Sequence, residues 1–225
     1  MLLNNILELP GKVFRCIGFM TFLFILISGS NLYFRCNKLI NYNKTNLEII
    51  KLNRDFYSNF TSFLLKRLFW IEIEIQNEKE LENMDLKKQN LIIISNHISY
   101  LDTFILTSLF PKIKNCNKCD FIGMESIFDW FIAGYVFKNL GMIPVKFEIS
   151  KFKNINKYSK KSVILANTKC INTLKNGNSL CMFPEGQCNY NPNKLNQIRG
   201  GAFKYHQESN TPIKIFAMKN NNLIW

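Results

Sequence analysis

Five short apolar runs, separated by segments with helical character, constrain the fold of this chain more than any other feature. The first run is Leu91-Ile92-Ile93-Ile94, and Thr103-Phe104-Ile105-Leu106 after it is typical of a helix. Strands alternating with helices imply a mainly parallel sheet covered on both faces. The sequence therefore predicts an α/β fold with a mainly parallel, mixed sheet. We expect strands near 91–95, 119–123, 142–146, 179–184 and 213–218, and helices near 100–109, 126–139, 162–175 and 201–208.

A histidine and an aspartate follow the first predicted strand. His97 falls on the strand-to-helix turn, and Asp102 falls in the first helical turn, where its carboxylate can bond the imidazole and fix its tautomer. A pair of this kind makes a general base. Ser99-x-x-Asp102 is also a capping box, so Asp102 can instead cap the helix and His97 can be an ordinary loop histidine. The two interpretations are compatible, because one carboxylate can accept hydrogen bonds from an imidazole and from a backbone amide.

Two further apolar strands end in polar or flexible residues. The run that begins at Ser179 leads to Glu185 and Gly186, and the run that begins at Gly141 leads to Lys146. Ligands of open α/β sheets bind at the carboxyl ends of the strands. Three strand ends thus offer a base, an acid and a cation.

These blocks, in this order and spacing, resemble the motifs of a known family. His-x4-Asp, Gly-x-Ile-Pro-Val with a following basic residue, and Phe-Pro-Glu-Gly are similar to those of the glycerolipid acyltransferases, most of all the 1-acylglycerol-3-phosphate (lysophosphatidic acid) acyltransferase branch. The similarity runs from about Ile71 to the C-terminus. Arg199-Gly200-Gly201-Ala202-Phe203 and Thr211-Pro212-Ile213 resemble later blocks of the family.

The resemblance implies transfer of a fatty acyl group from acyl-CoA or acyl carrier protein to the free hydroxyl of a lysophospholipid acceptor. It implies no cofactor, no metal and no covalent enzyme intermediate. The roles that it implies are general base and orienting acid for His97 and Asp102, acceptor phosphate binding for Lys146 and Arg199, shaping of the acceptor pocket for Glu185 and Gly186, and oxyanion binding for backbone amides at Ile143 and Val145.

The chain departs from the family pattern at several positions. Gln187-Cys188 stands where relatives carry Thr-Arg, Ile215 replaces a second proline, and Lys146 replaces an arginine, which keeps the charge but loses the bidentate fork. Two alternatives stay open: a different acceptor, such as glycerol-3-phosphate or another lysophospholipid, and a membrane-bound lipid-binding protein without activity. Cys188 could also serve as a nucleophile, but it lacks a base partner nearby in the sequence.

The first 70 residues differ in character from the rest, and we expect a membrane anchor and interfacial helix over 1–70 and the acyltransferase domain over 71–225. Residues 16–34 carry no charge, but their most apolar part, 17–27, is shorter than the ~20 residues that a membrane span needs. The segment can span as an anchor, lie in one leaflet or be a cleaved signal peptide; we favour an uncleaved anchor. More basic residues follow it than precede it, which predicts a cytosolic catalytic domain on a membrane such as the endoplasmic reticulum.

Aromatic residues follow the anchor in a nearly helical rhythm, with Lys66 and Arg67 among them. Such a helix can lie in a membrane interface or pack on the core of the domain. Residues 70–75 then alternate Ile with polar or aromatic residues, which predicts a strand with one solvent-exposed face. Residues 78–90 are charged and typical of a loop. The aromatic helix contains Phe56, Phe60, Phe63, Leu64 and Trp70.

Charge and cysteine content narrow the possible partners. The net charge of +13 suits nucleic acid, anionic membranes or phosphorylated substrates. We find no zinc-finger spacing, helix-turn-helix or aromatic RNA-binding motif, so nucleic acid is not expected as a partner. The 7 cysteines have no regular spacing. Cys116-x-x-Cys119 is the one close pair, and zinc would need two further ligands, so no metal site is predicted.

Overall fold

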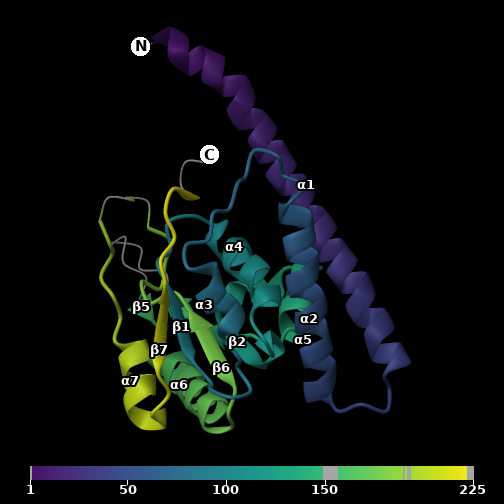
Figure 1. Cartoon of the computed structure of the whole chain (residues 1–225), viewed down its shortest axis with the longest axis vertical. Coiled ribbons are helices and arrows are strands. Elements are labelled where there is room, and N and C mark those ends of the chain that lie inside the picture. Colours follow the sequence, from purple (N-terminus) through teal and green to yellow (C-terminus); the bar gives the residue numbers. More distant parts are fainter. Residues whose placement is uncertain (1, 149–156, 190, 192–193, 222–225) are drawn as a thin grey trace.

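The centre of the protein is a parallel sheet of five strands in the order β3-β2-β6-β1-β7 (Figure 1). The structure is a computed structural model and describes residues 2–148, 157–189, 191 and 194–221. A separate antiparallel pair, β4 and β5, makes the architecture mixed, so the predicted α/β class is confirmed. The strands are β1 (Ile92–Ser95), β2 (Cys119–Met124), β3 (Ile143–Val145), β4 (Phe147–Glu148), β5 (Lys157–Tyr158), β6 (Ser179–Met182) and β7 (Ile213–Phe216).

Helices cover both faces of the sheet, with α6 and α7 packed on one side and α3 and α4 on the other. The α-helices are α1 (Leu2–Ile40), α2 (Asn46–Leu65), α3 (Glu78–Asn83), α4 (Asp102–Leu109), α5 (Ala133–Asn139), α6 (Lys160–Lys175) and α7 (Gly201–Ser209). Three 3₁₀ helices, η1 (Phe110–Lys112), η2 (Cys116–Lys118) and η3 (Glu125–Asp129), lie in the connections.

The central strand β1 shows why its sequence is a continuous apolar run. Ile92 and Ile94 pack in the core beneath α6 and α7, whereas Ile93 packs with Leu106 of α4 on the opposite face. Successive side chains of a strand point to opposite faces, so a strand buried on both faces must be apolar throughout. Every residue of β1 is buried.

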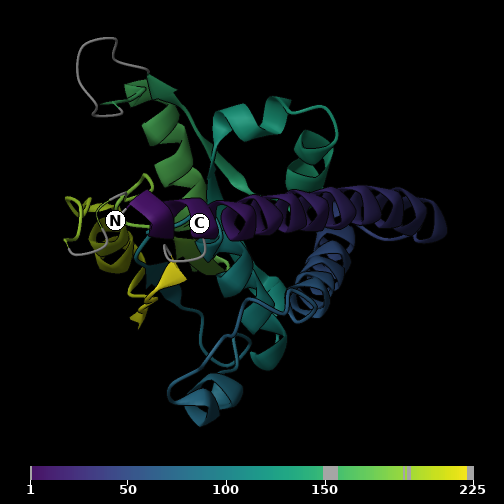
Figure 2. The same cartoon turned by 90° about the horizontal axis from the view of Figure 1, so that it is seen from above.

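The long helix α1 runs along one side of the molecule next to α2 (Figures 1 and 2). One face of α1, from Phe19 to Phe34, shares a hydrophobic core with α2, α4 and α5. The opposite face is exposed and apolar. The buried face carries Phe19, Phe22, Leu26 and Phe34, and the exposed face carries Ile17, Met20, Phe24 and Leu32.

Within the described residues, Gly11–Ile40 has the length and apolar composition that a membrane crossing requires. Its two-sided surface is compatible with partial burial against protein and partial contact with lipid. Membrane anchoring and the boundary at residue 70 stay predictions.

Most of the predicted aromatic helix lies in α2, whose packing on the core of the protein is observed, but α2 ends at Leu65 and does not include Trp70. Tyr33 of α1 stacks on Phe56 with ring centroids 3.8 Å apart, and Phe60 packs in the same core. Phe63 is half exposed, with the Arg67 guanidinium over its ring. An interfacial role for that exposed edge stays a prediction.

Three local predictions were wrong. Residues 70–75 form no strand, because among the described residues no strand pairs with them; Ile71 and Ile75 instead pack into two different cores. The helix predicted over 126–139 is broken into η3 and α5, and a Cβ on Gly134 would lie 2.2 Å from the Phe128 carbonyl oxygen, so the glycine permits this close crossing. The loop predicted over 78–90 contains α3.

Truncating a side chain on one face of α1 should affect stability, and truncating one on the other face should affect binding to lipid. Leu26→Ala should lower the free energy of unfolding by about 2–5 kcal/mol, because it leaves a cavity beside α2 and α4. Phe24→Ala, on the exposed face, should change it by less than about 0.5 kcal/mol but weaken binding to lipid vesicles. Denaturant unfolding and vesicle sedimentation measure the two effects. A large stability loss in Phe24→Ala, with unchanged vesicle binding, would show that this face is covered by protein instead.

Candidate functional site

His97 lies in the loop that leaves the carboxyl end of β1, and its imidazole contacts Asp102 at the start of α4. The Nδ1 atom of His97 is 3.0 Å from Oδ2 of Asp102. The His97 side chain is 16% exposed and that of Asp102 is fully buried. An ionised carboxylate only accepts hydrogen bonds, so in a neutral imidazole Nδ1 carries the proton and Nε2 keeps its lone pair. The contact fixes the tautomer that a general base requires.

The Asp102 carboxylate also organises the loop around His97. Its Oδ2 accepts hydrogen bonds from the backbone amides of Ile98 (2.6 Å) and Ser99 (2.9 Å), and its Oδ1 accepts from Asn221 Nδ2 (2.9 Å). The contact with the Ser99 amide is the one that the acid of a capping box makes, although the α-helix itself begins only at Asp102. Asp102 therefore both orients the imidazole and holds the preceding loop, so the two interpretations of its role coexist.

Glu185, which follows the neighbouring strand β6, also holds this loop by a hydrogen bond. One carboxylate oxygen accepts from the backbone amide of His97 (2.8 Å), and the other accepts from the amide of Asn196 (3.0 Å). Sequence reasoning placed Glu185 in the acceptor pocket and missed this contact. The register explains it: Ile94 pairs with Met182, so the residues three further along each strand, His97 and Glu185, come side by side.

The segment after β6 completes the surroundings of the imidazole. The Phe183 ring stacks on the His97 ring with centroids 4.2 Å apart, and the amide of Asn189 donates to the His97 carbonyl oxygen (2.6 Å). Gly186, with a φ of +70°, makes the turn of this segment. These contacts fix the position of His97 from both sides.

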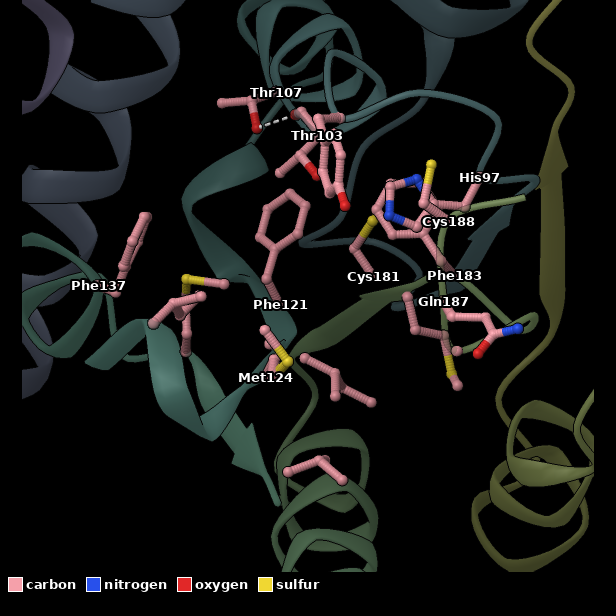
Figure 3. A pocket seen from close by; sticks show the side chains of 18 of the residues that line it. His97, Thr103, Thr107, Phe121, Met124, Phe137, Cys181, Phe183, Gln187 and Cys188 are labelled. Atoms are coloured by element: carbon pink, nitrogen blue, oxygen red, sulfur yellow. Dashed lines mark hydrogen bonds between the residues drawn. The ribbon is translucent and has the colours of Figure 1, made fainter. Parts of the chain in front are cut away.

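Cys188 lies close to His97 in Figure 3. Burial raises the pKa of its thiol to about 11, and the carboxylates of Asp102 and Glu185 add to the effect. A thiol is nucleophilic as the thiolate, so Cys188 is a weak nucleophile near neutral pH. The raised pKa therefore argues against the role of nucleophile that the sequence left open for Cys188.

A cavity of about 1700 Å³ has His97 in its wall. In Figure 3, His97, Gln187 and Cys188 lie toward one side of it, and Phe121, Met124 and Phe137 lie toward the other. Helices α1 and α5 contribute apolar side chains, whereas α4 also contributes the hydroxyls of Thr103 and Thr107. Other polar and basic lining residues come from α2, α6, α7 and the segment after β6. The apolar group includes Leu23, Ile27, Phe104, Trp130, Phe137 and Met142; the polar group includes Asn167, Gln187, Asn196, Arg199 and Lys204.

The structure brings some predicted binding residues to this cavity and leaves others apart. Gly186 and Arg199 line it, and Arg199 also donates from Nε to the Glu185 carbonyl oxygen (3.4 Å). Lys204, on α7, lines it too and had no signal in the motif pattern. The Lys146 side chain is 62% exposed, faces Glu125 at 3.9 Å and is not part of the lining.

The predicted oxyanion amides lie on β3. Val145 lines the cavity, and Ile143 is buried against α6. In the sheet order, β3 is three strand spacings from β1, roughly 14 Å. An oxyanion donor must lie within about 3 Å of the developing charge. The assignment stays a prediction, and the sheet order does not favour it.

The cysteine pair Cys116 and Cys119 is buried, and burial raises the pKa of Cys116 to about 11. Among the described residues, no three His, Cys, Asp or Glu side chains gather as they would around a metal ion.

Comparison with known proteins shows that the part of the chain that contains the His97–Asp102 pair matches one family. A family model described as "Acyltransferase" matches residues 72–219, which include His97, Asp102, Glu185 and Arg199. The chain is 29% identical over 149 residues to a chloroplastic 1-acyl-sn-glycerol-3-phosphate acyltransferase of Arabidopsis thaliana, covering 64% of this chain and 36% of that protein. It is 26% identical over 133 residues to a chloroplastic protein of the same description from Brassica napus, covering 59% and 34%.

The chain thus spans about one third of the length of these curated relatives. A solved structure, that of the 1-acyl-sn-glycerophosphate (LPA) acyltransferase from Thermotoga maritima, is similar with a TM-score of 0.62. The match has 17% identity and covers 90% of this chain and 73% of that one. At this identity the likeness shows a shared fold.

The state of Cys188 can be tested directly by alkylation. With a pKa near 11, the thiol should react with iodoacetamide at pH 7 orders of magnitude more slowly than an ordinary exposed cysteine, and the rate should rise with pH toward 11. Mass spectrometry of modified peptides measures this, with exposed Cys36 as the internal control. Equal labelling of Cys188 and Cys36 at pH 7 would contradict the assignment and restore Cys188 as a candidate nucleophile.

Proposed function

The chain belongs to the acyltransferase family, and from this premise we propose that it moves a fatty acyl group from an acyl thioester to the free hydroxyl of 1-acylglycerol-3-phosphate, forming phosphatidic acid. The single observation that carries the proposal is the His97–Asp102 pair, with the His97 ring in the wall of a cavity that is lined by apolar side chains and by basic ones. An acyl chain fits the first environment and a phosphate the second. The similar plant proteins are described as acyltransferases of the same acceptor.

In the proposed reaction, Nε2 of His97 takes the proton from the acceptor hydroxyl as its oxygen attacks the thioester carbonyl carbon. The tetrahedral intermediate then collapses, the carbon–sulfur bond breaks, and the imidazolium returns the proton to the leaving thiolate. Asp102 holds the ring and stabilises the imidazolium. Glu185 contributes indirectly, because it holds the His97 backbone. The thioester is already activated, so the protein needs no nucleophile of its own.

The acceptor phosphate is assigned to the basic side of the cavity. Arg199 lines it from the loop before α7, and Lys204 lines it from the first turn of α7. Lys146 would have to leave Glu125 and change its rotamer to reach the cavity. We therefore assign the phosphate to Arg199 first and keep Lys146 as a secondary candidate.

One departure from the family pattern supports an alternative acceptor. Gln187 and Cys188, which stand where relatives carry Thr-Arg, both line the cavity and bring no positive charge to it. Glycerol-3-phosphate or a lysolipid with another head group is the alternative acceptor. A lipid-binding protein without activity is less favoured, because binding alone does not require the His97–Asp102 pair.

The proposed setting is a membrane, where both lysolipid and product reside. The apolar exposed face of α1 and the net charge of +13 support contact with an anionic lipid surface. We propose a cytosolic orientation on the endoplasmic reticulum; the chloroplastic relatives make a plastid membrane the alternative.

The catalytic pair is tested by substitution in the full chain. With labelled acyl-CoA and lysophosphatidic acid, His97→Ala should lower kcat by about 10²–10⁴-fold, since a positioned base contributes that much. Asp102→Asn should also lower kcat, because an amide can hold the wrong tautomer. Thermal unfolding controls for folding. If Asp102→Asn lowers only the melting temperature, its role is limited to holding the loop, and turnover within tenfold in a folded His97→Ala variant would reject the general base.

Acceptor recognition is tested with a panel of lysolipids. Arg199→Ala should raise KM for lysophosphatidic acid about 10-fold or more, because a charge-assisted hydrogen bond to phosphate is lost. KM for the acyl donor should change less. Lys146→Ala is the matched control and should have the smaller effect on KM of the acceptor. If both variants leave KM unchanged while a choline-headed lysolipid is a better substrate, the acceptor is wrong and the His97–Asp102 assignment stands.

A further inference from the structure

The segment that follows β7 is hydrogen-bonded to the His97 loop. The side-chain amide of Asn96 donates to the Met218 carbonyl oxygen (2.9 Å) and accepts from the Met218 backbone amide (2.7 Å). Three residues further on, Asn221 donates from Nδ2 to Oδ1 of Asp102 (2.9 Å). The end of the described chain thus touches both sides of the catalytic loop.

The Asn221 contact is the one that bears on the chemistry. The other carboxylate oxygen, Oδ2, is engaged with the His97 ring and the amides of Ile98 and Ser99. A carboxylate that is held at one oxygen only can still rotate about its Cβ–Cγ bond. A donor on Oδ1 fixes the plane of the group and hence the direction from Oδ2 to Nδ1. Asn221 is itself buried, so its side-chain amide is largely shielded from water.

We propose that Asn221 is a positioning residue that fixes the plane of the Asp102 carboxylate, and that Asn96 holds the Met218–Asn221 segment in place for this purpose. The proposal rests on the assignment of His97 and Asp102 as the reacting pair. Asn221 lies outside residues 72–219, so the family match assigns it no role. The consequence is that the β7 end of the sheet controls how well His97 is oriented.

Asn221→Ala in the full chain is the first test. It should lower kcat about 10-fold or more, within the ~100-fold that a misplacement of about 1 Å can cost, and leave KM for both substrates unchanged. Asn220→Gly is the matched control, because Asn220 is exposed, has a φ of +67° that glycine tolerates, and lies in the same segment. An equal loss in both variants would mean that any disturbance of the segment suffices, and it would overturn the proposal.

A double-mutant cycle separates positioning from general stability. In an Asp102→Asn background, Asn221→Ala should have little further effect on kcat, since the carboxylate that it positions is gone. Additive losses would reject the mechanism. Asn96→Ala reaches the same contact from the opposite side, and it should reproduce the fall in kcat with unchanged KM even if Asn221→Ala folds poorly.

A spectroscopic measurement tests the positioning role of Asn221 without measuring acyl transfer. The chain has 2 histidines, so the ¹⁵N ring signals of His97 can be assigned with the His97→Ala variant. In Asn221→Ala, the share of the Nδ1–H tautomer of His97 should fall, whereas Asn220→Gly should leave it unchanged. An unchanged tautomer ratio in Asn221→Ala would overturn the proposal. A changed ratio in a protein that transfers no acyl group would instead reject the function and keep the positioning role.

Discussion

The buried carboxylate of Asp102 is the group on which the site depends. It accepts hydrogen bonds from the His97 ring, from the amides of Ile98 and Ser99, and from Asn221. A fully buried carboxylate without such donors would be strongly destabilising. The loop, the first turn of α4 and the segment after β7 are therefore held together by the same contacts that orient the imidazole. Stability and chemistry use one set of hydrogen bonds here.

The parallel sheet supplies the second constraint. Because β1 and β6 are adjacent and in register, the residues after their carboxyl ends emerge side by side. This is why Glu185 can hold the His97 backbone and Phe183 can stack on its ring. A rigid scaffold places these groups more precisely than a loop could by itself. Cys188 is partly buried in the same place, and this burial, with the carboxylates of Asp102 and Glu185 nearby, raises the pKa of its thiol.

Helix α1 connects the N-terminal region to the cavity. Its inner face completes a core with α2, α4 and α5, and Leu23 and Ile27 reach the cavity wall. Its outer face exposes large apolar side chains. One helix thus combines a structural face, a cavity face and a face suited to lipid. Removing the first 35 residues would therefore expose core and open the cavity, so single substitutions separate these roles better than deletion does.

The sequence by itself determined the fold class, the five strands of the main sheet and the nearness of His97 to Asp102, because periodicity and a spacing of five residues across a strand-to-helix turn are local properties. It did not predict the short pair β4 and β5. It failed for residues 70–75, since a strand exists only where a partner strand lies beside it. It also could not show that Glu185 binds the His97 amide, that Asn221 binds Asp102, or that Lys146 lies outside the cavity lining. These facts follow from the strand order and register, and from where the segment after β7 crosses the loop. They join residues far apart in the chain, and only the tertiary structure decides them.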